Sequence, residues 1–322
     1  MKQKLHSFVW KCLAAILVFL STSLASYSQY SESTASWEAG ISLGPANFLG
    51  DLGGKYGKGT TFIKDHNIQM TKLMFGAYVA YYPNEWIGFR LAGNIGTIEG
   101  DDAIIKPKGS YEEARLTRNS NFKSKIQEVL LMAEFYPTVF LEYEPSDVYH
   151  KLRPYGVIGI GGFHFNPQGT DPANGNWVYL KPLRTEGQGM AEHPDRKEYS
   201  LTQVNVPMGV GLKYFATETF SISLEVLHRV TFTDYIDDVS TKYIDPALFY
   251  SYMPLAQAQV AERLANKSGG NSMSNTPFLP GQKRGTETNN DGYFSFGVKL
   301  GITLGANSDK RWRNSTRCPV RF

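Results

Sequence analysis

Residues 203–232, QVNVPMGVGLKYFATETFSISLEVLHRVTF, decide the fold. Apolar and polar side chains alternate with a period of two through 203–215 and again through 220–232, which is the pattern of a strand with two different faces. Only 216–219 separates the two runs, as in a hairpin. Comparable runs, some with less regular faces, occur at about 37–43, 71–82, 86–98, 122–136, 154–165 and 293–304. The sequence therefore predicts eight strands.

The lengths of these strands and of their connections favour a membrane barrel. Most runs have about 11–15 residues, which exceeds the length usual in soluble proteins and suits a tilted membrane-spanning strand. The connections have roughly 26, 3, 23, 17, 37, 4 and 60 residues, so long ones alternate with short ones, as in outer-membrane barrels. We expect an all-β fold, an eight-stranded antiparallel transmembrane β-barrel over 37–304, with long extracellular loops and short periplasmic turns.

A soluble β-sandwich would also give alternating strands. The length of the strands, the alternation of long and short connections and the aromatic residues at the strand ends argue against a sandwich. We expect the following aromatic residues to form girdles at the two membrane surfaces: Trp37, Tyr81, Tyr82, Trp86, Tyr136, Tyr155, Tyr214, Phe220, Phe232 and Tyr293.

The N-terminus reads as an export signal. Residues 1–25 contain three lysines, the apolar run CLAAILVFL and a small-residue cleavage pattern, Ser23-Leu24-Ala25. Removal of the signal leaves 30 Lys+Arg, because 33 − 3 = 30, against 30 Asp+Glu, which argues against nucleic acid as a partner. Residues 26–36 would then be a periplasmic lead-in, and Cys318 would be the only mature cysteine, so any disulfide would be intermolecular.

The predicted inward faces carry four acids and four bases. Buried charges are tolerated when they are paired, so this balance predicts a salt-bridged plug in a closed barrel, although an enzymatic use of the carboxylates remains an alternative. The network comprises Glu38, Arg90, Glu128, Glu134, Lys213, Glu225, Arg229 and Lys299.

The longest connection, 233–292, is acidic at its start and helical in composition further on. Asp234, Asp237 and Asp238 supply oxygen ligands of the kind that Ca²⁺ prefers, but their spacing matches no known calcium loop. We favour solvated charge at the barrel rim and predict neither a metal nor a cofactor. Residues 247–267 have helical composition interrupted at Pro254, with Asp245-Pro246 as the start signal.

The tail, 305–322, is basic, with a net charge of +4 from five Lys and Arg against Asp309. With an even number of strands it follows the barrel on the periplasmic side, where it could bind a periplasmic partner or anionic lipid. A disordered polar tail is the alternative. The predicted docking residues are Lys310, Arg311, Trp312, Arg313 and Arg317.

No hydrolase, metalloprotease or phosphate-loop motif occurs in the chain. The histidines show no ligand spacing, and a site centred on His193 at the barrel rim is the remaining enzymatic alternative. The sequence therefore favours a protein that is not an enzyme.

Several segments resemble the PorG-type outer-membrane barrels of Bacteroidota, a family linked to the type IX secretion system. The most specific are NFLGDLGG (47–54), YYPNEW (81–86) and TFTDYIDDVS (231–240), and the resemblance runs from about Trp37 to Leu304. It implies an integral outer-membrane protein that anchors or assembles the secretion machinery, with a periplasmic ring lipoprotein and other secretion components as partners. The alternative function is a stand-alone structural or adhesive barrel that binds ligands through its surface loops.

Overall fold

The computed structural model describes residues 35–52, 68–105, 112–141, 148, 151–217, 219–268 and 277–304. The predicted signal (1–25), nearly all of the lead-in and the basic tail (305–322) lie outside the described residues.

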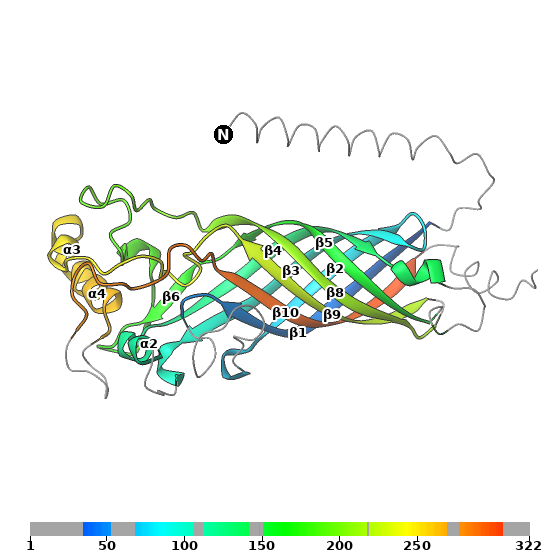
Figure 1. Ribbon diagram of the computed structural model, residues 1–322, viewed down its shortest axis with the longest axis horizontal. Helices are drawn as coiled ribbons and strands as arrows, with labels where there is room; N and C mark the ends of the chain where they lie inside the picture. Colours follow the sequence, from blue (N-terminus) through cyan, green and yellow to red (C-terminus); the bar gives the residue numbers. More distant parts are fainter. Residues whose placement is uncertain are drawn as a thin grey trace, which may run out of the picture. The chain divides into compact units, whose positions relative to one another are not determined.

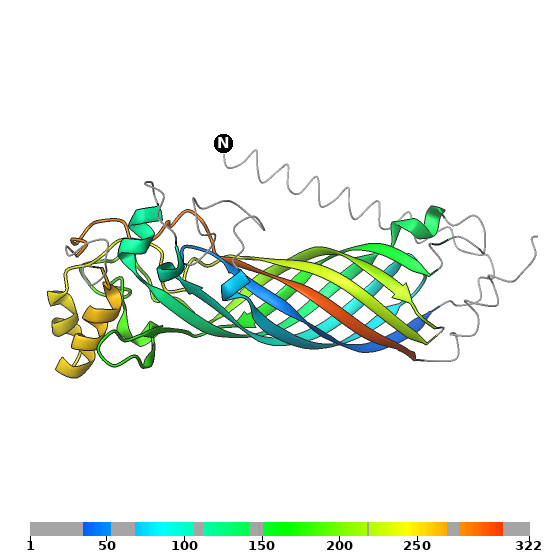
Figure 2. The ribbon, with the colours of Figure 1, turned by 90° about the horizontal axis from the view of Figure 1, so that it is seen from below.

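Eight long antiparallel strands form a closed barrel (Figures 1 and 2). They are β1 (Ser36–Leu49), β2 (Lys72–Tyr82), β3 (Ile87–Asp101), β4 (Asn121–Phe135), β5 (Leu152–His164), β8 (Thr202–Phe215), β9 (Phe220–Thr231) and β10 (Gly292–Leu304). Sequential neighbours pair along the sheet, β1 pairs with β10, and the pairing of β3 with β4 closes the ring. The predicted all-β, eight-stranded antiparallel barrel is confirmed.

Shorter elements lie in the connections. They are η2 (Ile68–Met70), η3 (Asp102–Ile104), α2 (Glu112–Arg118), η4 (Pro137–Leu141), β6 (Pro167–Thr170), β7 (Trp177–Tyr179), η6 (Lys181–Leu183), α3 (Ala247–Tyr252) and α4 (Leu255–Ala265). The hairpin of β6 and β7 extends the sheet beyond the barrel by pairing with the start of β4.

The outer wall of the barrel is apolar. Outward side chains such as Ile41, Leu91, Leu131 and Ile160 are 54–66% exposed, and every strand contributes to the band. An apolar surface of this extent faces lipid in outer-membrane barrels. Among the described residues, no helix has both the length and the hydrophobicity to cross a bilayer.

The connections that follow β1, β3, β5 and β9 pack together at one end of the barrel. We call the described residues 50–52, 68–71, 102–105, 112–120, 165–201, 232–268 and 277–291 the outer cap. Figure 1 shows α3 and α4 of this cap beyond the strand ends. The short turns lie at the other end, which is the periplasmic one by the rule that outer-membrane barrels have short periplasmic turns.

The cap has a hydrophobic core that is continuous with the upper barrel. Phe122 and Phe163 from the strands belong to the same buried cluster as Leu183, Phe249 and Leu264 from the cap. Helix α4 contributes because Ala258, Ala261, Leu264 and Ala265 fall on one face of the helix and are buried. Pro254 separates α3 from α4, since it lacks the N–H that a continuous helix would require.

Two details of the strands differ from the sequence-based expectation. The strand predicted at about 37–43 continues as β1 to Leu49, and its pairing with β10 breaks at Gly44 and Pro45 and resumes at Ala46, because proline cannot donate to the ladder. In addition, four of the ten predicted girdle residues point into the barrel and are buried, so this part of the girdle prediction is wrong: Tyr82, Tyr136, Tyr155 and Tyr293.

Candidate functional site: the lumen and the outer cap

The barrel lumen holds a charge network. The eight charged residues predicted to face inward are each at most 8% exposed: Glu38, Arg90, Glu128, Glu134, Lys213, Glu225, Arg229 and Lys299. Strand alternation brings them to the inside, since every second residue of a strand shares a face. The structure brings all eight into ion pairs.

Four of these charges form the middle of the network. Nη1 of Arg90 lies 3.0 Å from Oε1 of Glu134, and Nη2 lies 2.7 Å from Oε2 of Glu225. Nζ of Lys299 lies 3.3 Å from Glu134 and 3.5 Å from Glu225. Two cations therefore neutralise two carboxylates across the width of the lumen.

The remaining charges form one ion pair on each side of this group. Toward the periplasm, Nζ of Lys213 lies 2.6 Å from Oε2 of Glu38. Toward the cap, Nη2 of Arg229 lies 2.6 Å from Oε1 of Glu128. The pairs follow one another along the barrel, so charge is balanced locally.

Each lumen carboxylate also accepts a hydrogen bond from at least one tyrosine. The hydroxyl-to-carboxylate distances are 2.9 Å for Tyr78 to Glu38, 2.8 Å for Tyr82 to Glu134, 2.6 Å for Tyr136 to Glu134, 2.8 Å for Tyr155 to Glu225 and 2.6 Å for Tyr293 to Glu128. The hydroxyl of Tyr82 also accepts a bond from Lys213 at 3.1 Å and so links two groups of the network. Sequence analysis did not predict that these tyrosines face the lumen. Tyr293 nevertheless lies six residues before Lys299, and Tyr136 two residues after Glu134, and residues separated by an even number of positions share a face.

Inward glycines make room for the tyrosine rings. A Cβ atom on Gly211 would lie 2.3 Å from Cζ of Tyr155, and one on Gly88 would lie 2.4 Å from Cε1 of Tyr82. Both distances are far below van der Waals contact, so a larger residue would displace the ring. The small residues facing the lumen therefore have a packing role.

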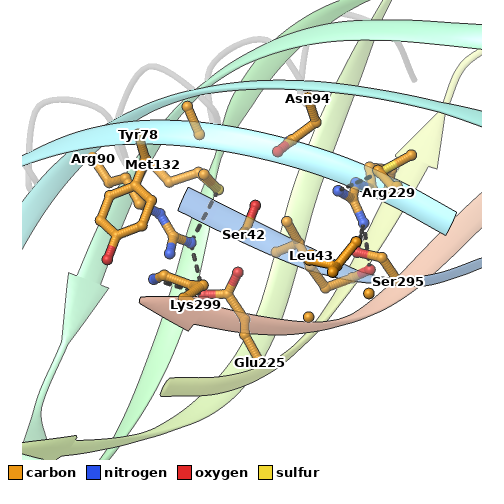
Figure 3. Close-up of a pocket in the computed structure, with 15 residues that line it drawn as sticks. Ser42, Leu43, Tyr78, Arg90, Asn94, Met132, Glu225, Arg229, Ser295 and Lys299 are labelled. Carbon is orange, nitrogen blue, oxygen red and sulfur yellow. Dashed lines mark hydrogen bonds and ion pairs between the residues drawn. The ribbon is translucent and has the colours of Figure 1, made fainter. Parts of the chain in front are cut away.

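A small cavity of about 40 Å³ remains inside the lumen (Figure 3). Arg90, Glu225 and Lys299 line one part of it, and Ser42, Ser295 and Arg229 line another. Gly297 also lines it, and a Cβ atom at this position would meet nothing within 4 Å. Because a water molecule needs about 10–15 Å³ of such space, the cavity suits a few waters and is too small for a solute pathway.

Two buried arginines hold the outer cap together. Arg284 donates from Nη1 to Oε1 of Glu186 at 2.8 Å and to the carbonyl of Asp238 at 2.6 Å. Arg118 donates to the carboxylate of Asp102 at 2.7 and 3.0 Å and to the carbonyl of Arg284 at 2.8 Å. These bonds join the connections after β3, β5 and β9, so the cap is a packed layer that covers the barrel mouth.

The acidic residues at the start of 232–291 are buried in this cap. Asp237 and Asp238 are 0% exposed and Asp234 is 7% exposed, so the expectation of solvated rim charge is wrong. Asp237 accepts the backbone N–H groups of Leu52 and Val239, both at 2.9 Å. Asp238 accepts the Tyr199 hydroxyl at 2.8 Å and the Thr185 hydroxyl. Packing against the cap core explains the burial, which sequence spacing could not reveal.

Burial raises the pKa of these carboxyl groups. The pKa of Asp234 rises to about 8, and the Ser240 hydroxyl opposes the shift. The pKa of Asp238 rises to about 6, with the Arg284 guanidinium opposing it. Over the part of the chain that the structure describes, no three His, Cys, Asp or Glu side chains converge in a way that could hold a metal ion.

The remaining sequence-based candidates lie apart from the lumen. His193 is half-buried in the turns of the cap, where its pKa is lowered by burial and by the nearby Arg196 guanidinium. Its backbone N–H donates to the carbonyl of Met190 at 3.1 Å. The predicted docking residues of the tail, Lys310 to Arg317, and Cys318 fall outside the described residues.

The chain is similar to known outer-membrane proteins. The family described as "Outer membrane protein beta-barrel domain" matches residues 14–245. Among solved structures, the attachment invasion locus protein Ail of Yersinia pestis in complex with sucrose octasulfate is 10% identical, with 83% of this chain and 99% of that chain covered and a TM-score of 0.34. The outer membrane protein OprG of Pseudomonas aeruginosa is 10% identical, with 86% and 99% covered and a TM-score of 0.32. A search of curated proteins found no significant match.

The family match covers 232 of 322 residues, because 245 − 14 + 1 = 232, and agrees with the closed sheet and its apolar outer wall. The chain therefore belongs to the outer membrane β-barrel family and is an integral protein of the outer membrane.

Proposed function

We propose that this protein is a non-enzymatic barrel that anchors or assembles the type IX secretion machinery at the outer membrane. The observation that carries the proposal is the filled lumen, which suits an anchor better than a pore: ion pairs and tyrosine hydrogen bonds cross it from every side. The type IX assignment rests on the resemblance of 47–54, 81–86 and 231–240 to PorG-type barrels.

The proposed partners are a periplasmic ring lipoprotein and other secretion components. We propose two segments for contact on the periplasmic side: the connection between β4 and β5 beyond Leu141, and residues 305–322, which follow Leu304 in the sequence. The tail carries the stronger charge, with Lys310, Arg311, Arg313 and Arg317 around Trp312. A basic surface of this kind would attract an acidic patch on a partner.

The test is co-purification from the native outer membrane in mild detergent, followed by mass spectrometry. The full chain is compared with a variant in which Lys310, Arg311, Arg313 and Arg317 are replaced by Gln. We expect near-stoichiometric periplasmic components with the full chain and several-fold less with the variant. Recovery of the barrel alone, even after crosslinking, would contradict the anchoring role.

The second candidate function is a structural or adhesive barrel that binds external ligands. The observation in its favour is the folded outer cap, which presents exposed apolar side chains on α3 and α4, among them Tyr250, Tyr252 and Leu255. Because much of 232–268 is packed into the cap core, deletion of the loop would disrupt the cap. The double variant Tyr250→Ser with Leu255→Ser is the better test. Loss of binding of external ligands to the cap, with unchanged co-purification of periplasmic components, would favour this function.

A further inference from the structure

The connection between β4 and β5 contains a short 3₁₀ helix, η4 (Pro137–Leu141), whose side chains point in two directions. Val139 packs against the buried residues of the lower lumen. Phe140 and Leu141 remain 59% and 53% exposed. Figure 2 shows this green turn at the end of the barrel opposite to α3 and α4. One side of the segment thus packs against the lower lumen, and the other presents two large apolar residues outward.

Phe140 belongs to a cluster of three aromatic rings on the outer wall. Its ring centroid lies 6.1 Å from that of Trp86 and 6.3 Å from that of Phe135, and Trp86 lies 6.2 Å from Phe135. Phe135 is the last outward residue of β4, and Trp86 precedes β3. Phe140 is therefore folded back against the barrel wall.

This cluster is continuous with the lipid-facing band. Along β4, Val129, Leu131 and Phe135 point outward and are 45–60% exposed. The stretch from Tyr136 to Leu141 carries no charged side chain. Exposed apolar area costs about 25 cal/mol per Å² in water, and tryptophan favours the membrane–water boundary. The exposed side chains of η4 therefore extend the apolar, lipid-facing band toward the periplasmic end of the barrel.

We propose that η4 lies in the interfacial layer of the periplasmic leaflet, with Phe140 and Leu141 inserted at the boundary between headgroups and acyl chains. The occupant of this apolar surface is lipid. Val139 and the aromatic cluster hold the segment against the barrel, so the connection serves as a membrane anchor at its start. A periplasmic protein would then find its contacts elsewhere, and this inference does not depend on the secretion role.

The test measures the depth of a nitroxide label at Leu141→Cys in a chain whose two native cysteines, Cys12 and Cys318, are replaced by Ser, refolded into vesicles of phosphatidylcholine and phosphatidylglycerol. Two labelled controls bracket it: Leu131→Cys in the lipid-facing band, and Ala216→Cys, which is exposed on the short turn between β8 and β9 at the same end. Collision with oxygen reports lipid, and collision with a water-soluble nickel chelate reports water. A heat-dependent gel shift establishes that each variant is folded.

We expect the label at 141 to collide with the chelate several-fold less often than the label at 216, and to remain accessible to oxygen. Adding Phe140→Ser to the labelled chain should shift the label toward water, whereas Phe140→Leu should leave it in place. Chelate collision equal to that at 216 would overturn the proposal. So would protection from both reagents, because that would mean the surface is covered by protein.

Discussion

At the scale of single residues, the lumen shows what a buried carboxylate requires. An ionised carboxylate loses its hydration when it is buried, and a cation alone does not satisfy all of its lone pairs. Glu134 illustrates the solution: it pairs with Arg90 and Lys299 and also accepts the hydroxyls of Tyr82 and Tyr136. The cations therefore balance the charge of the carboxylate, and the tyrosines complete its hydrogen bonding. Loss of either kind of partner should lower the free energy of unfolding.

Removal of Arg90 tests this dependence. Arg90→Met leaves Glu134 and Glu225 to share Lys299, so we expect a loss of about 3–5 kcal/mol in the free energy of unfolding, as is usual when one partner of a buried ion pair is removed. The measurement is the urea midpoint of the barrel folded in lipid vesicles. Leu91→Val, on the lipid-facing side of the same strand, is the control and should change stability little. Equal losses in both variants would contradict the argument.

The pKa of Asp234 leads to a pH prediction for the cap. In the folded protein the pKa is about 8, whereas an unfolded aspartate titrates near 3.9. The folded state therefore binds more protons, and stability falls as the pH rises from about 4 to about 8 and is flat above that. Asp234→Asn should remove this part of the pH dependence and stabilise the cap at pH 8.5, by at most a few kcal/mol. Limited proteolysis at pH 6 and pH 8.5 compares the stability of the cap in the parent chain and in Asp234→Asn. The same pH dependence in both would contradict a raised pKa at Asp234.

The alternation of side chains between the two faces of a strand predicts which charged residues face the lumen, but it predicts the lumen tyrosines poorly. A charge on an otherwise apolar barrel must face inward, so Glu38 and Lys299 are recognisable from alternation alone. Tyrosine suits both a membrane girdle and a lumen, so the position of Tyr82 and Tyr155 at strand ends wrongly predicts that they belong to the girdle. The glycines opposite them, Gly88 and Gly211, reveal their direction only when the strands are paired. Register, which alternation does not give, is the missing information.

At the scale of elements, α4 shows how a surface loop becomes part of a core. Leu264 is 2% exposed and lies in the cluster shared by the cap and the upper barrel, whereas Leu255 on the same helix is 66% exposed. Leu264→Ala should leave a cavity and cost about 2–5 kcal/mol. We expect faster proteolysis of the cap while the heat-dependent gel shift of the barrel persists. Leu255→Ala is the matched control, and equal protease sensitivity of the two variants would contradict a packed cap.

The elements that sequence analysis did not predict depend on distant partners. β6 and β7 have only four and three residues and exist because β6 pairs with the start of β4. Helix α2 ends at Arg118, whose bonds reach Asp102 and Arg284 in other parts of the cap. Long strands have a strong local period, but short elements in a packed loop layer do not. For this reason the barrel could be predicted and most of the cap could not.

At the scale of the whole barrel, two layers close the passage through it. The lumen network fills the middle, with Glu38, Arg90 and Arg229 each in a buried ion pair. Above it, the outer cap is held by the hydrophobic core that it shares with the upper barrel and by arginine bonds of its own. The two layers share few charged contacts, so loosening the cap should leave the lumen filled.

This separation gives a prediction about permeability. Proteoliposomes with the intact barrel should not swell in a small sugar such as arabinose, because the lumen cavity of about 40 Å³ suits only a few waters. The Leu264→Ala variant, whose cap is loosened, should also fail to swell, since the ion pairs below the cap remain. A general porin in the same vesicles is the positive control. Swelling with Leu264→Ala alone would mean that the cap is the only barrier, and swelling with the intact chain would mean that the lumen network opens in the membrane.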